Sequence, residues 1–279
     1  MSDRKYAYAY PAVPQVTPTA PHKCRRFEGK HVLLTAATHG MGLAMATRFA
    51  EEGARISLSS RKQDSVDAAV EKLRELGHEV SGIVCHQAKE KDRRRFIEFA
   101  VAQYGKIHAV VLCAGVQPGA ATGPTLDVHP ELYDKIFDVN VKSFWSFTRD
   151  AMEHLSAGAS FVFVSSVAAY KPDFPLGLYG VSKCALVAFT RLMAAELGPS
   201  GFRFNCIAPG IVRTKFSSFL WDTGEDGKDL LRERENEAFL RRLAEPWEMA
   251  GAAAFLCSRD ASYITGQTVL MDGGTHSRM

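Results

Sequence analysis

Short apolar runs alternate with helix-like stretches along most of this chain, from about Phe27 onward. Runs such as Phe161–Val164 are apolar at every position, which is typical of strands buried on both faces of a parallel sheet. The pattern predicts strands over seven segments: His31–Ala36, Ala54–Ser59, Val80–Cys85, His108–Cys113, Ser160–Ser165, Phe202–Ala208 and Gln267–Met271.

The intervening stretches place apolar residues at helical spacing. The clearest helices are expected over Gly40–Glu52, Asp64–Leu76, Lys89–Tyr104, Pro130–Leu155, Tyr179–Leu197 and Pro246–Cys257. Asp64 is expected to cap its helix, and Gly77 to follow the end of that helix. This alternation predicts an α/β fold, a Rossmann-type doubly wound sheet of seven parallel strands with helices on both faces, in a single domain over residues 27–279.

Two segments depart from the alternation. Residues 1–26 contain four prolines and no apolar signal core, so we interpret them as an extended arm, either disordered or laid on a neighbouring subunit. Residues 214–242 are long and charged and hold Phe216, Phe219 and Trp221 close together. They form either a flap over a substrate site, which we favour, or a surface insertion.

Composition narrows the classes of partner. The chain has 279 residues, of which 46% are apolar and 23% charged, and its formal net charge of +3 is too small to indicate nucleic acid or a membrane surface. None of the six cysteines forms a CxxC pair, and several, such as Cys113, lie in apolar runs. This usage favours a reducing compartment and argues against a disulfide scaffold or a metal site. No segment is expected to be apolar enough to span a membrane.

The turn after the first predicted strand, residues 35–42, carries Gly40 and Gly42. Glycines there let the backbone approach a pyrophosphate, whose charge the helix N-terminus meets. An acidic residue at the end of the second strand normally selects NAD, but Ser60 and Arg61 stand there instead. Arg61 can hold a 2′-phosphate bidentately and His39 can add a second donor, which favours NADP(H). The alternative is that the Arg61 region is an ordinary charged surface.

Tyr179 and Lys183 lie four residues apart at the start of a predicted helix, so their side chains share one face. A phenol titrates near a pKa of about 10, and a nearby ammonium is expected to lower that pKa, which suits a general acid/base. Ser166 ends a strand at the ligand-binding edge, where its hydroxyl can hold a substrate oxygen. Asn140 lies mid-helix, where asparagine has poor propensity, which suggests an interior contact with water or backbone. An exposed tyrosine and lysine with this spacing also occur by chance.

Together these residues resemble the short-chain dehydrogenase/reductase family, over about Phe27 to Thr275. The features occur in the family's order: the glycine loop, Asn140, Ser166, Tyr179 with Lys183, and Pro209-Gly210 followed by Thr214. Within the family the chain is most similar to a group of peroxisomal NADPH-dependent carbonyl and retinal reductases, through segments such as Ser59–Gln63, Val164–Ala169 and Ala261–Gly266.

The resemblance implies a role for each site residue. Tyr179 would be the acid/base, Lys183 would lower its pKa and bind the nicotinamide ribose, Ser166 would hold the substrate oxygen, and Asn140 would anchor a proton-relaying water. It also implies a homotetramer built through long helices such as Tyr179–Leu197. The residues it assigns to the cofactor are Thr35, Thr38, His39, Gly40, Met41, Ser60, Arg61, His86, Ala114, Gly115, Tyr179, Lys183, Pro209, Gly210, Val212 and Thr214.

The chain departs from the family pattern on the adenosine side of the expected site. Ala36 replaces the first loop glycine, residues 112–115 read Leu-Cys-Ala-Gly in place of Asn-Asn-Ala-Gly, and His86 replaces an aspartate on the adenine. These departures are expected to affect the affinity for the cofactor more than the catalytic chemistry.

The sequence therefore predicts an oxidoreductase that transfers a hydride between NADP(H) and a small apolar carbonyl or alcohol. Two alternatives stay open, a 3-ketoacyl thioester reductase and an NADPH-binding scaffold or sensor without chemistry. The candidate pocket residues are Tyr170, Phe174, Phe216, Phe219 and Trp221. The ending Ser277-Arg278-Met279 is similar to the Ser-Lys-Leu peroxisomal address, the alternative being a tail without that meaning on a cytoplasmic protein.

Overall fold

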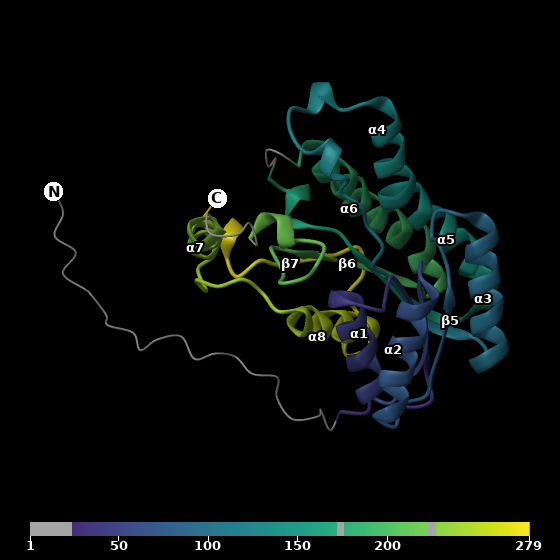
Figure 1. Ribbon diagram of the computed structural model, residues 1–279. Helices are drawn as coiled ribbons and strands as arrows, with labels where there is room; N and C mark the ends of the chain where they lie inside the picture. The colour runs from purple at the N-terminus through teal and green to yellow at the C-terminus, as the bar shows by residue number, and fades with distance from the viewer. Residues whose placement is uncertain (1–23, 172–175, 222–226, 279) are drawn as a thin grey trace, which may run out of the picture.

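A seven-stranded parallel sheet forms the centre of the computed structural model, which describes residues 24–171, 176–221 and 227–278 (Figure 1). The strand order is β3-β2-β1-β4-β5-β6-β7, so the direction of winding reverses between β1 and β4. The strands are β1 (His31–Thr35), β2 (Arg55–Ser60), β3 (Val80–Val84), β4 (Ile107–Leu112), β5 (Leu155–Val164), β6 (Arg203–Pro209) and β7 (Thr268–Met271). The doubly wound parallel sheet predicted from the sequence is confirmed.

Helices cover both faces of the sheet. Their bounds are α1 (Gly40–Glu51), α2 (Gln63–Glu75), α3 (Glu90–Tyr104), α4 (Pro130–Phe137), α5 (Ser143–Ala151), α6 (Gly177–Leu197), α7 (Gly227–Glu237) and α8 (Pro246–Cys257). Because successive side chains of a strand point to opposite faces, β1 contributes to two separate cores. Leu34 packs on the side of α1, α2 and α8, whereas Leu33 packs on the side of α3, α5 and α6.

The helix expected over Pro130–Leu155 is divided in the structure. A π-helical segment, Asp138–Lys142, separates α4 from α5, and Leu155 already belongs to β5. A π-helical turn inserts a residue and changes which side chain faces inward. It places Asn140 at zero exposure with hydrogen bonds to the Val116 backbone, which agrees with the interior contact expected for this residue. The expected cap of α2 was also wrong, because Lys62 holds the N-cap position without a side-chain hydrogen bond and Asp64 lies in the first turn.

The helix α6 is more apolar than the sequence analysis expected. Together with its 3-10 extension it spans Gly177–Ser200 and reaches a mean hydropathy of 1.3 over 18 residues, enough by length and composition to cross a membrane. In the fold it lies on the sheet, with Leu186 fully buried and Met193 nearly so. Its outer side still exposes Val181 and Leu192.

The turn between β1 and α1 holds a non-glycine residue in the left-handed region, since Ala36 has φ of 53°. An L-residue there meets steric strain that a glycine avoids. The turn is also tight. A Cβ on Gly42 would lie 2.2 Å from the Ala36 carbonyl oxygen, so this position requires a glycine. The strain follows directly from the missing first loop glycine.

We predict that Ala36→Gly raises the free energy of unfolding by about 0.5–1 kcal/mol, because relief of left-handed strain exceeds the added flexibility of the unfolded chain. Urea denaturation monitored by circular dichroism measures this. The matched control is Gly77→Ala, at φ of 83° with no atom within 4 Å of the new Cβ, which is expected to lose about 1 kcal/mol. A loss of stability in Ala36→Gly would contradict the assignment of strain.

Candidate active site

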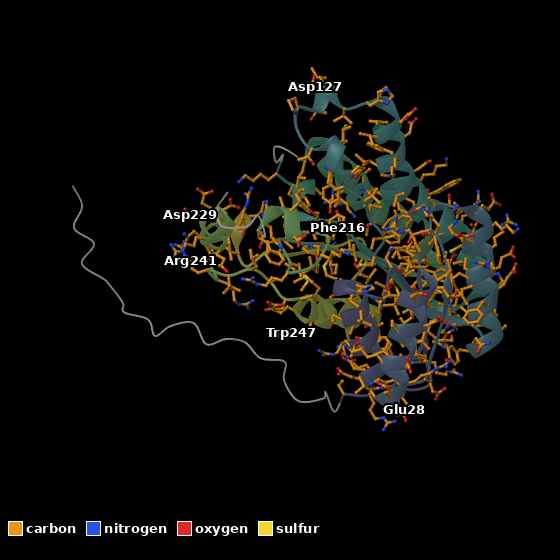
Figure 2. All side chains as sticks on the ribbon, viewed as in Figure 1. Glu28, Asp127, Phe216, Asp229, Arg241 and Trp247 are labelled. Carbon is orange, nitrogen blue, oxygen red and sulfur yellow. The ribbon has the colours of Figure 1, made fainter. Side chains whose placement is uncertain are left out.

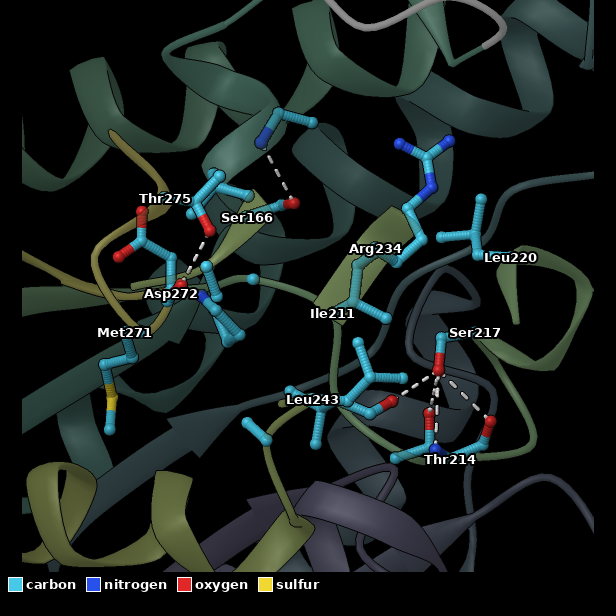
Figure 3. A pocket seen from close by; sticks show the side chains of 18 of the residues that line it. Ser166, Ile211, Thr214, Ser217, Leu220, Arg234, Leu243, Met271, Asp272 and Thr275 are labelled. Carbon is cyan, nitrogen blue, oxygen red and sulfur yellow. Dashed lines mark hydrogen bonds between the residues drawn. The ribbon is translucent and has the colours of Figure 1, made fainter. Parts of the chain in front are cut away.

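The carboxyl edge of the sheet carries a cavity of about 410 Å³, bounded by the chain segments that follow β5, β6 and β7. Figure 3 shows Ser166 and Asp272 on one side of this cavity and Thr214 and Ser217 on another. Ligands of open parallel sheets bind at this edge. The wall is mostly apolar, formed by residues such as Met41, Ile211, Phe216, Leu243 and Met271.

Ser166 and Tyr179 both line the cavity, as the sequence predicts. The Ser166 hydroxyl accepts a hydrogen bond of 3.2 Å from the amide of Ala168, in the 3-10 turn after β5. The start of α6 packs closely on this turn, because a Cβ on Gly180 would lie 2.8 Å from the Ala168 carbonyl oxygen. Gly180 thus allows the approach that places Tyr179 beside Ser166.

The Tyr179 phenol is almost fully buried, with 8% of the residue exposed. Burial raises the pKa of Tyr179 to about 12, although a hydrogen bond from Ser166 acts in the opposite direction. The sequence analysis expected Lys183 to lower this pKa, but in the structure the pKa is raised. The physical reason is that desolvation outweighs any stabilisation of the phenolate.

Lys183 shares a face of α6 with Tyr179, and its Nζ lies 5.5 Å from the centroid of the Tyr179 ring. The ammonium donates a hydrogen bond of 2.9 Å to the carbonyl of Val164. No described carboxylate pairs with it, and burial lowers the pKa of Lys183 to about 8. Lys183 is therefore a buried cation beside the phenol, held by a neutral acceptor.

Asn140 lies behind the cavity and links three elements. Its Nδ2 donates to the carbonyl of Val116 and to the hydroxyl of Ser182, both at 3.0 Å, while its Oδ1 accepts from the Val116 amide at 2.8 Å. These contacts hold the loop after β4 against α6. Gly115 completes the contact, because a Cβ there would lie 3.3 Å from Nζ of Lys183. Ala114 precedes Gly115 in the same loop and is half-buried.

The glycine loop lies directly against the segment after β6. A Cβ on Gly40 would lie 3.1 Å from Cγ2 of Thr214, so the missing side chain permits this approach. Thr38 is buried, and its hydroxyl lies 3.0 Å from Nδ1 of the exposed His39. The loop thus joins the edge of the cavity to the exposed N-terminus of α1.

The residues predicted after β6 also lie at the cavity. Pro209, Gly210, Val212 and Thr214 line it. A Cβ on Gly210 would lie 3.0 Å from Cα of Asp272, so this glycine allows the turns after β6 and β7 to meet. The four residues therefore form a continuous wall.

Thr35, which the resemblance assigns to the cofactor, has its hydroxyl engaged by other parts of the chain. It is buried, its hydroxyl donates to Oε1 of Gln87 at 2.5 Å, and it accepts from the Cys113 amide at 3.3 Å. Gln87 continues the network by donating to Ser143 of α5 at 2.7 Å. The Thr35 hydroxyl is thereby engaged in joining strands and α5.

The ends of β2 and β3 carry polar atoms without partners. The hydroxyl of Ser59 and Nδ1 of His86 are buried and form no hydrogen bond. Arg61 is exposed next to the half-buried Ser60, forms no ion pair with any described residue, and acts together with burial to lower the pKa of His86. Buried unpaired polar atoms beside an unpaired cation fit an anionic ligand with hydrogen-bonding groups, as the adenosine half of NADP is.

The segment expected to be a flap covers the cavity in part. Phe216, Phe219 and Leu220 line the cavity, and the Phe216 ring centroid lies 6.2 Å from that of Tyr179. Figure 2 shows Phe216 toward the middle of the molecule, whereas Asp229 and Arg241 lie at its outer edge. Movement of the segment stays a prediction.

Part of the flap is tied down at Ser217. Its hydroxyl bonds to the Val212 carbonyl and accepts from Nε1 of Trp221 at 3.1 Å. Figure 3 shows its further hydrogen bonds with Thr214. Trp221 and Tyr170, expected at the pocket, do not line it, and Phe174 lies outside the described residues.

Sequence reasoning missed a second group of lining residues. Gln117 follows β4, Arg234 lies in α7, and Thr275 and His276 follow β7. A signal was present for the last two, because the chain after the seventh predicted strand reaches the same carboxyl edge as Ser166. Arg234 carried no comparable signal.

Comparison with known proteins decides the family. A family model described as enoyl-(acyl carrier protein) reductase matches residues 35–276. Tropinone reductase-like 3 of Erythroxylum coca is 44% identical, covering 91% of this chain and 96% of its own length. Dehydrogenase/reductase SDR family member 4 of Homo sapiens is also 44% identical, over 90% and 88% of the two chains. The chain belongs to the short-chain dehydrogenase/reductase family.

Solved structures of this family share the fold. A short-chain dehydrogenase/reductase of Mycobacterium ulcerans aligns with a TM-score of 0.82 and 30% identity, over 89% and 90% of the two chains. A member from Brucella melitensis, named a glucose/ribitol dehydrogenase, aligns with a TM-score of 0.83 and 29% identity, over 91% and 99%. The chain is thus an oxidoreductase of this family.

We predict that Lys183→Met stabilises the cofactor-free enzyme by about 2 kcal/mol near neutral pH, and that this gain disappears by about pH 10. Between pH 8 and 10.5 the unfolded chain keeps a proton that folded Lys183 has released. The contribution of Lys183 to stability therefore rises with pH across this window, as the buried charge is lost. Urea denaturation from pH 7 to pH 10 measures the difference in the free energy of unfolding between Lys183→Met and the starting protein. Titrations that both proteins share cancel in this difference.

The matched control is Lys142→Met, which removes an exposed ammonium paired with Asp138 and is expected to show no such pH-dependent difference. A constant difference between Lys183→Met and the starting protein would mean that Lys183 titrates normally.

Proposed function

We propose that this protein reduces small, largely apolar carbonyl compounds with NADPH, or oxidises the corresponding alcohols, with Tyr179 as general acid/base. The observation that carries the proposal is the meeting of Ser166, Tyr179 and the buried Lys183 at one apolar cavity on the carboxyl edge of the sheet. In such a cavity hydrogen bonds to developing charge act in low dielectric.

The chain's own residues supply the proton chemistry. Tyr179 stays protonated at neutral pH and donates to the carbonyl oxygen during reduction, while Ser166 holds the same oxygen. Lys183 adds positive charge close to the phenol when the phenolate forms. Asn140 is a positioning residue, because its amide fixes the Val116 backbone and α6 around Lys183. NADPH, when bound, supplies the hydride.

Several features support NADP(H) as the cofactor. Ser60 stands at the end of β2 where a carboxylate would repel a 2′-phosphate, and Arg61 beside it forms no ion pair with any described residue. Ser59 and His86 offer unpartnered atoms to the adenosine. Gly40, Met41 and the neighbouring wall Pro209–Thr214 would hold the phosphates and the nicotinamide.

A 3-ketoacyl thioester reductase is the second candidate, since the matching family model is described as enoyl-(acyl carrier protein) reductase, an activity that also acts on an acyl thioester. An NADPH-binding scaffold without catalytic activity is less well supported. A protein that had lost its activity would have no reason to keep all four of the residues Ser166, Tyr179, Lys183 and Asn140. Assays with free ketones and with acyl thioesters separate these functions.

We further propose that the protein assembles as a homotetramer through α5 and α6. Trp145, Val181 and Leu192 are about half-exposed on these helices, and apolar surface of this kind favours burial by another subunit. A peroxisomal location rests on Ser277-Arg278-Met279 alone, and the placement of Met279 and of the Ser277 and Arg278 side chains lies outside the described structure.

We predict that Tyr179→Phe lowers kcat for ketone reduction by at least about 10³-fold while the Kd for NADPH changes by less than about threefold. Only the proton donor is lost, and the ring still fills its place. Steady-state absorbance and fluorescence titration of NADPH measure the two quantities. The control Tyr133→Phe alters an exposed ring and is expected to leave both unchanged. Retained turnover in Tyr179→Phe would refute the assigned role.

We predict that the starting protein prefers NADPH to NADH by at least about 100-fold in kcat/KM, and that Arg61→Ala reduces this preference at least tenfold. The guanidinium contacts a phosphate that NADH lacks. Lys62→Ala is the matched control, removing the neighbouring exposed cation, and is expected to change the ratio less. Equal use of the two cofactors by the starting protein would overturn the assignment.

A further inference from the structure

Unpaired polar atoms gather at the active-site cavity. Eight buried side-chain nitrogen and oxygen atoms in the described chain form no hydrogen bond, and three of them belong to residues that line this cavity. They are Oε1 of Gln117, Nε of Arg234 and Nε2 of His276. A buried polar atom without a partner costs about 1–3 kcal/mol, so a ligand group that pairs with it gains that energy.

The hydrogen-bonding role of His276 follows from Asp272. The Asp272 carboxylate accepts from Nδ1 of His276 at 2.7 Å and from the amides of His276 and Gly274 at 2.9 and 3.0 Å. Burial alone would raise the pKa of Asp272, but these hydrogen bonds hold it below its usual value. An ionised carboxylate only accepts, so Nδ1 of His276 carries a proton, and Nε2 is the ring atom left without a partner.

Gln117 presents an unpaired acceptor. Its Nε2 donates to the carbonyl of Ala121 at 3.3 Å, which fixes the orientation of the amide and leaves Oε1 as the unpaired atom. Arg234 differs, because its Nε carries a proton while its Nη1 already donates to Glu237 at 2.8 Å. The residues that line the cavity therefore hold an unpaired acceptor in Gln117, an unpaired donor in Arg234 and an unpaired ring nitrogen in His276.

We infer that the substrate carries a hydroxyl group away from its reacting carbonyl, and that His276 and Gln117 recognise this hydroxyl. A hydroxyl both donates and accepts, so it can pair with Nε2 or Oε1 as well as with Nε of Arg234. A carboxylate or an ether only accepts, so it would leave Oε1 of Gln117 without a donor. This inference rests on the proposed carbonyl reduction, which it refines from an apolar ketone to a hydroxylated one.

The test uses acetophenones that bear a methyl, hydroxymethyl, methoxymethyl or carboxyl group at the meta or para position, with NADPH as the reductant. At one of the two positions, kcat/KM for the hydroxymethyl compound is expected to exceed the values for the other three by about tenfold or more. His276→Phe and Gln117→Leu, each checked by its melting temperature, are expected to reduce this ratio to below about threefold. His78→Phe and the exposed Gln103→Leu are matched controls that keep the full ratio.

The outcomes separate the two proposals. If the methyl compound is reduced as well as the hydroxymethyl compound, the hydroxyl inference fails and the proposed function stands. A preference for the carboxyl compound also overturns the inference, because it indicates an anion site. If no member of the series is reduced, the proposed function fails and the inference falls with it.

Discussion

A buried ammonium that pairs with no carboxylate of the described residues is the constraint around which the active site is arranged. Lys183 is 2% exposed, and its Nζ is held by a backbone carbonyl, that of Val164. A buried charge is unfavourable because it is desolvated, unless it stabilises an opposite charge on a neighbouring group. The Tyr179 ring 5.5 Å away is that neighbour, because a phenolate there gains from the cation. Burial displaces the pKa values of both groups toward their neutral forms.

The surrounding structure keeps this ammonium in place. Gly115 leaves room for Nζ, and Asn140 fixes the backbone next to Gly115 through both of its amide atoms. The π-helical segment is what turns Asn140 inward. The interruption of the long expected helix is thus part of the site, and a regular helix through this segment would direct a different residue toward Lys183.

Much of this arrangement could be predicted from the sequence. The fold followed from strand-length apolar runs, and the Tyr179–Lys183 pair from helical spacing, because both signals are local. The π-helical segment, the buried role of Thr35 and the contribution of His276 were not predictable in the same way. Each depends on contacts between segments far apart in the chain. The direction of the Tyr179 pKa shift was also missed, since spacing reports proximity and says nothing about desolvation.

The contact between the glycine loop and the segment after β6 links the two ligand surfaces mechanically. A side chain on Gly40 would meet Thr214, the Thr214 hydroxyl lies 3.2 Å from that of Ser217, and Ser217 accepts a hydrogen bond from the indole of Trp221. A dinucleotide that displaced the loop would therefore press on the segment that carries Phe216, whose ring centroid lies 6.2 Å from that of Tyr179. Such a connection favours an ordered kinetic sequence, in which the nucleotide enters first and shapes the wall that the second reactant meets.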